Sequence, residues 1–153
     1  MGPFIILALG IVIIGFIIGK PIALEYRRKR LRAKHFPLKW KLLLEKRLPI
    51  YHRLPENLKT QLHGHIQVLL AEKQFIGCAG LVITEEIKVT IAAEAGILLL
   101  NRKTHYYQDL TYILVYPSAF IVNREVSNAA GIHTIEREVL TGESWDTGKV
   151  IIA

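Results

Sequence analysis

The stretch from residue 75 to residue 100, FIGCAGLVITEEIKVTIAAEAGILLL, constrains the fold most, because it joins a strand pattern to a helix that is apolar on nearly every face. The aliphatic run Leu81 to Ile83, which follows two glycines, predicts a buried strand. Thr84 is a suitable helix N-cap, and the two glutamates after it suit the positive end of a helix dipole. The sequence therefore predicts a central core helix over residues 85 to 100.

The first 24 residues are almost wholly apolar, and no charged residue precedes Lys20. A helix needs about 20 such residues to cross a bilayer. A cleaved signal peptide would begin with a basic segment, which is absent here, and a helix of a soluble core would have to be buried on every face. We therefore predict a transmembrane anchor at residues 1–24.

A basic segment follows the apolar run directly. Twelve of the twenty lysines and arginines lie between residues 20 and 53, against two glutamates. Basic residues beside an apolar helix mark the cytoplasmic side and bind anionic lipid, whereas a nucleic-acid binder carries its positive charge on the folded surface. We predict a single-pass membrane protein with its N-terminus outside, a cytoplasmic domain, the lipid bilayer as partner and no nucleic-acid partner. The residues of this basic cluster are Arg27, Arg28, Lys29, Arg30, Arg32 and Lys34.

Residues 25–53 form the predicted juxtamembrane segment, and residues 36 to 49 within it have the pattern of a short amphipathic helix bounded by Pro37 and Pro49. Trp40 would lie either at the level of the lipid headgroups or against the folded domain. The sequence leaves both positions open.

Residues 54–153 form the predicted domain. A helix from Pro55 to about Lys73 and the central helix precede a β-rich half, in which TGESWDTG is interpreted as the turn before the last strand. Helices followed by strands indicate an α+β fold, with helices packed on a small, mainly antiparallel sheet. The predicted strands are residues 112 to 116, 120 to 122, 135 to 140 and 150 to 152.

Catalytic and metal-ligating patterns are missing from the sequence. His63 and His65 are two residues apart on a predicted helix and lie on different faces, so they cannot share one ion unless the helix breaks at Gly64. The chain has no HExxH motif, no G-x-S-x-G elbow and no phosphate-binding loop. Cys78 is the only cysteine and allows no internal disulfide. We predict no catalytic residue and no metal ligand in this chain.

Three runs together resemble the zinc-dependent peptidases of the Mlc titration factor family: LPENLKTQLHGHIQVLLAEKQFIGCAGLVITEEIKVTIAAEAGILLL, YYQDLTYILVYPSAFIV and TGESWDTGKVII. The resemblance implies a metallopeptidase whose zinc is held by an HExxH helix and a later glutamate. In that family the HExxH helix follows the strand that matches residues 149–153, where this chain ends. The resemblance thus implies the N-terminal part of an incomplete zincin-like domain, inactive alone, with the zinc in the full-length parent.

Two roles follow from that resemblance. In the first, Val150, Ile151 and Ile152 form an edge strand that pairs with an extended peptide substrate, although an interior strand without substrate contact fits the sequence equally well. In the second, the chain is a non-catalytic module that sequesters a transcriptional regulator at the membrane, a role that the family suggests. The face left open by a missing metal helix would be apolar, so we also predict self-association.

Overall fold

The computed structural model describes Leu9 and residues 19–117, 120–127, 133–140, 142–145 and 148–152, with side chains described up to Pro117 and again from Gly148. Most of the predicted anchor at residues 1–24 lies outside these ranges. Among the described residues, no helix has both the length and the apolar character needed to cross a bilayer. The continuous path begins with a helix over residues 19–32, the basic helix, which carries most of the basic cluster.

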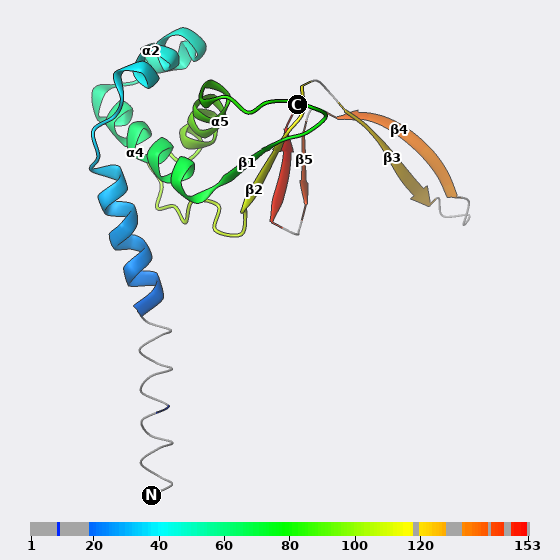
Figure 1. The fold of residues 1–153 in the computed structure, drawn as a ribbon, viewed down its shortest axis with the longest axis horizontal. Coiled ribbons are helices and arrows are strands. Elements are labelled where there is room, and N and C mark those ends of the chain that lie inside the picture. Colours follow the sequence, from blue (N-terminus) through cyan, green and yellow to red (C-terminus); the bar gives the residue numbers. More distant parts are fainter. Residues whose placement is uncertain are drawn as a thin grey trace, which may run out of the picture.

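Four further helices and six strands follow. The helices are α2 (Leu38–Arg47), α3 (Pro49–Arg53), α4 (Glu56–Glu72) and α5 (Glu85–Ile97). The strands are β1 (Gln74–Gly77), β2 (Tyr112–Val115), β3 (Phe120–Ser127), β4 (His133–Leu140), β5 (Gly142–Trp145) and β6 (Lys149–Ile152). In Figure 1 the helices lie to one side of the strands, and α5 lies between α4 and the sheet. The α+β prediction is confirmed.

The ends of α5 follow the predicted capping chemistry. The Thr84 side chain accepts a hydrogen bond of 3.2 Å from the backbone N–H of Ile87, which satisfies one of the free donors of the first turn. The regular helix ends at Ile97, three residues earlier than predicted, and turns continue to Asn101, whose φ of 57° is left-handed. The N-cap prediction is confirmed.

The four-stranded sheet has the order β1-β2-β6-β5, in which β1–β2 and β2–β6 are parallel and only β5–β6 is antiparallel. The prediction of a mainly antiparallel sheet is therefore wrong. A helix, α5, connects β1 to β2, and such a crossover returns the chain in the parallel direction. The antiparallel pair β3–β4 forms a separate two-stranded sheet, which extends away from the four-stranded sheet in Figure 1.

The predicted strand at Leu81 to Ile83 is a loop, and the strand lies earlier, at β1. The chain turns back on itself after Gly77, where a Cβ atom would collide with the carbonyl oxygen of Leu81. Ala79 and Gly80 both have positive φ, as tight turns require. The glycines therefore mark the turn that ends the strand and do not mark its start.

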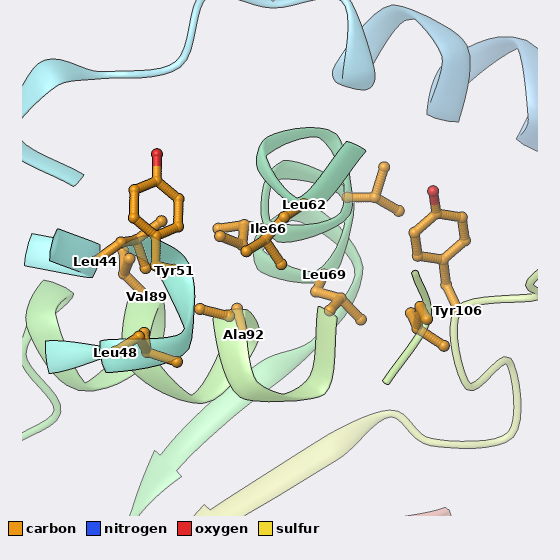
Figure 2. Close-up of a cluster of buried hydrophobic side chains, with 12 residues drawn as sticks. Leu44, Leu48, Tyr51, Leu62, Ile66, Leu69, Val89, Ala92 and Tyr106 are labelled. Carbon is orange, nitrogen blue, oxygen red and sulfur yellow. The ribbon is translucent and has the colours of Figure 1, made fainter. Parts of the chain in front are cut away.

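The hydrophobic core lies among the helices (Figure 2). Leu44 and Tyr51, from α2 and α3, lie at one end of the cluster, α4 and α5 contribute its centre, and Tyr106 lies at the other end. Trp40 packs on this domain: its indole N–H donates a 2.8 Å hydrogen bond to Glu85 at the start of α5. Of the two positions that the sequence left open for Trp40, the structure has the one against the domain.

Candidate functional site

An apolar groove of about 570 Å³ lies between α5 and the four-stranded sheet. Its walls are aliphatic and aromatic side chains, with Lys73 and Glu94 as the charged exceptions. Concave apolar surfaces of this size are typical of ligand or partner sites. The groove-lining residues from α5 and its end are Ile91, Ala92, Glu94, Ala95 and Leu98, and those from the sheet are Ile113, Val150 and Ile152.

The two long faces of α5 have different surroundings. Val89, Ala93 and Gly96 are buried against the helical core. Gly96 allows the closest approach, since a Cβ there would lie 2.9 Å from the Leu62 side chain on α4. On the groove side the apolar stripe is open, and Leu98 is 66% exposed. Ile91 and Ala95 on the groove side of α5 are only partly buried, so the groove face of α5 is less covered than the face toward the core.

The strand β6 forms part of the groove floor. Val150 and Ile152 line the groove, whereas Ile151 is buried. β6 pairs with β2 on one side and with β5 on the other, so it is an interior strand and the sheet edges are β1 and β5. Of the two positions that the sequence left open for Val150, Ile151 and Ile152, the structure has the interior one, and the edge position is wrong. The reason is that TGESWDTG contains the strand β5 and not only a turn.

Lys73 has a structural role at one end of the groove. Its Nζ donates hydrogen bonds of 2.7 Å to the carbonyl oxygens of both Tyr107 and Leu110. Burial lowers the pKa of Lys73, and the two carbonyl oxygens satisfy two of its three donors. The ammonium thereby fixes the loop that closes the groove next to β2.

The basic cluster is divided by the structure. Arg28 is only 6% exposed, and its guanidinium forms two 2.8 Å hydrogen bonds with the Glu72 carboxylate. These bonds raise the pKa of Arg28. Arg32 is partly covered by Tyr106 and by an ion pair with Glu25. The remaining members, Arg27, Lys29, Arg30 and Lys34, are exposed.

Gly64 of α4 lies where the basic helix crosses α4. A Cβ at Gly64 would lie 3.1 Å from Arg32 Cγ, so a larger residue there would push the Arg32 side chain aside, whereas glycine permits the close crossing. The helix α4 continues through Gly64 without a break. From the sequence, Gly64 was interpreted only as a possible break in the helix. A glycine in the middle of a helix can also indicate that a second helix packs closely there, and this is its role here.

The two neighbouring histidines of α4 face different surroundings, as predicted. His63 stacks on Phe36 at 3.9 Å and its Nε2 lies 2.8 Å from the Tyr51 hydroxyl. His65 lies on the other side, with Nδ1 2.9 Å from the Tyr106 hydroxyl. In the part of the chain that the structure describes, no three His, Cys, Asp or Glu side chains converge as a metal would require. The described residues therefore do not fit a zinc site.

Comparison with known proteins gives the family. The sequence profile described as glucose-regulated metallo-peptidase M90 matches residues 23–153. The Synechocystis sp. protein slr2042 is 40% identical over 152 residues, which are 97% of this chain and 54% of that protein. Mlc titration factor A of Yersinia pestis is 25% identical over 105 residues, which are 69% of this chain and 39% of the relative.

This chain thus spans about half the length, or less, of these relatives. No solved structure matches the chain at a significant level. The family profile covers everything after the apolar N-terminal run, which confirms the resemblance drawn from the sequence. The chain belongs to the glucose-regulated metallo-peptidase M90 family.

Proposed function

We propose that this chain is the N-terminal half of a membrane-tethered zinc metallopeptidase domain at the cytoplasmic face, and that it is inactive until the other half covers the groove. The observation that carries the proposal is the open face of α5. Leu98, in the turn directly after α5, is 66% exposed, the opposite face of α5 is core, and the neighbouring sheet surface is also apolar. A stable domain covers apolar surface of this extent.

The length of the relatives supports the same division. The matched region is 54% of slr2042 from Synechocystis, so a comparable length of chain remains in that protein. The zinc ligands that the family requires are proposed to lie in that remaining part, since the described residues here offer no converging set. An extended peptide substrate would pair with a sheet edge, and the edges of this sheet are β1 and β5.

The proposed tether rests on the apolar run at residues 1–24 and on the exposed members of the basic cluster. Lys29 and Arg30 are exposed on the helix that follows the apolar run, and Arg27 is also exposed, with a 3.5 Å hydrogen bond to the Ala71 carbonyl oxygen of α4. Exposed basic side chains at that position interact with anionic headgroups of a cytoplasmic leaflet.

A fusion tests the proposal. The complete 153-residue chain is joined to the part of slr2042 that follows its matched region, and zinc content and peptide hydrolysis are measured for the fusion and for the chain alone. We expect the fusion to retain about one zinc ion per molecule and to cleave peptide, and the chain alone to do neither.

Two matched variants test whether the second half of the domain packs on the groove. Leu98→Asp places a charge in the groove, whereas Val82→Asp places one on a loop position that is 78% exposed. In the fusion, Leu98→Asp should abolish hydrolysis and Val82→Asp should not, because only the first prevents the second half from packing. Tight zinc binding by the chain alone, or full activity of the Leu98→Asp fusion, contradicts the proposal.

A further inference from the structure

A second cavity, of about 340 Å³, lies where the basic helix, α4 and the loop after α5 meet. Three cationic side chains line it, Arg32, Arg102 and Lys103, together with one carboxylate, Glu25. Glu25 is paired with Arg32. Among the residues that the structure describes, no carboxylate forms an ion pair with Arg102 or Lys103. The cavity therefore has an excess of positive charge.

The loop that carries two of these cations is held in place. Asn101 has a left-handed backbone, and its N–H donates a 3.2 Å hydrogen bond to Oε1 of Gln61 on α4. Gln61 itself lines the cavity. Arg102 and Lys103 therefore start from a fixed backbone, which reduces the conformational entropy lost when they bind a ligand.

Tyr106 links Arg32 to His65. Arg32 Nη1 can only donate, so the Tyr106 hydroxyl oxygen accepts its 3.2 Å hydrogen bond. The same hydroxyl lies 2.9 Å from His65 Nδ1, and it donates to Nδ1 in the tautomer that carries the ring proton on Nε2. Burial, together with the charge of Arg32, lowers the pKa of His65, which favours the neutral ring. Figure 2 shows Tyr106 at the end of the core cluster, beyond Leu69.

In that tautomer the His65 Nε2–H is a buried donor without an acceptor. His65 is only 3% exposed and lines the cavity, and its Nε2 forms no hydrogen bond in the structure. The backbone of Leu99 is near enough to oppose the fall in the pKa of His65, but it does not meet hydrogen-bonding geometry. A buried donor without a partner is costly and is normally satisfied by a partner molecule.

We propose that this cavity is a binding site for a phosphate group, held by Arg32, Arg102 and Lys103 and accepting a hydrogen bond from His65 Nε2. A phosphate has several acceptor oxygens, so it can satisfy the histidine donor and the cations together. The group comes either from an anionic lipid headgroup, since the basic helix follows the apolar N-terminal run, or from a soluble phosphate compound. The site is separate from the groove and does not depend on its cover.

Calorimetric titration of the complete chain in neutral detergent tests the site. The probes are inorganic phosphate, dihexanoyl phosphatidylglycerol and, as the zwitterionic control, dihexanoyl phosphatidylcholine. The variant Arg102→Gln/Lys103→Gln removes two cavity cations from exposed positions. The matched control, Lys46→Gln/Arg53→Gln, removes one exposed lysine and one exposed arginine from α2 and α3, outside both the cavity and the basic helix.

We expect saturable binding of inorganic phosphate or of the phosphatidylglycerol, and the cavity variant should weaken it at least about tenfold, as the loss of one charge-assisted hydrogen bond does. The control variant should change it less than about threefold. Binding of inorganic phosphate identifies a soluble ligand class, and binding of the phosphatidylglycerol alone identifies a lipid headgroup. No binding of either probe, binding of the phosphatidylcholine with equal affinity, or equal losses in the two variants overturns the site.

Discussion

The two faces of α5 show how differently one apolar helix can be covered within the same chain. Toward α4, Val89, Ala93 and Gly96 are closely packed and buried. Toward the sheet, Ile91 and Leu98 line a groove of about 570 Å³. The residue types on the two faces are similar, so hydrophobicity alone does not determine which face is closed. The difference is that α4 is present on one side and no described element lies over the groove on the other.

Polar groups are buried beside α5 only where they have partners. On the helical side, Glu72 and the His105 carbonyl oxygen accept hydrogen bonds from the buried Arg28 guanidinium. On the groove side, Lys73 is buried and donates to two backbone carbonyl oxygens, whereas Glu94 is exposed. Burial of polar groups on both sides thus depends on partners that are already in place.

Breaking the buried ion pair between Arg28 and Glu72 should have the largest effect on the free energy of unfolding. Glu72→Ala leaves Arg28 buried without its carboxylate, so we expect the free energy of unfolding to fall by about 3–5 kcal/mol. Urea unfolding of the complete chain measures this. The control Glu56→Ala removes a carboxylate from an exposed pair with Lys59 and should cost less than about 1 kcal/mol. Equal losses for the two variants would show that the basic helix is not held by Arg28.

Truncating one side chain on each face of α5 should give a smaller but clear difference. Val89→Ala creates a cavity in the closed face and should lower the free energy of unfolding by about 2 kcal/mol. Leu98→Ala removes a larger but exposed side chain and should cost less than about 0.5 kcal/mol in this chain. Urea unfolding of both variants checks the comparison. If Leu98→Ala proves the costlier change, the groove is already covered in solution.

The sequence predicts the parts of the fold whose determinants are local. The N-cap at Thr84 and the proline-bounded helix α2 follow from neighbouring residue types, and the structure confirms them. The direction of the sheet was missed, although a helix between two strands is the ordinary sign of a parallel pair. The strand β5 was missed because its glycine and polar residues resemble a turn.

The division of the basic cluster could not be predicted locally. Arg28 looks the same as Arg27 or Lys29 in the sequence, and its burial depends on Glu72, which is 44 residues away. The close approach of the same helix to α4 at Arg32 involves Gly64, which is also distant in the sequence. The second cavity also depends on distant residues, since Tyr106 must bridge Arg32 and His65. Such sites arise from tertiary contacts and have no short motif.

Self-association should be sensitive to the open face alone. An exposed apolar surface favours pairing of two copies, so we expect the complete chain in dilute neutral detergent to dimerise. Leu98→Lys should weaken the dimer about tenfold by removing apolar contact area from the groove. Val82→Lys, a change at an exposed position outside the groove, should leave the dimer intact. Sedimentation equilibrium measures both, and a monomer in the unmodified chain would contradict this prediction.

The smallest expected effect is a pH dependence of the folding stability, caused by two histidines on the helical side. Burial lowers the pKa of His63 and of His65 in the folded chain, while the unfolded chain has the ordinary value of about 6.5. The unfolded state therefore binds protons first as the pH falls. Stability is fully present above about pH 6.5 and declines as the pH falls from that value toward the folded pKa values. Urea midpoints at pH 7.5 and 5.5 should show the decline, and His63→Gln should reduce it. His35→Gln, a change at an exposed histidine, should leave the decline in the urea midpoint unchanged. If His63→Gln also leaves the decline unchanged, the whole pH dependence comes from His65 or from groups outside α4.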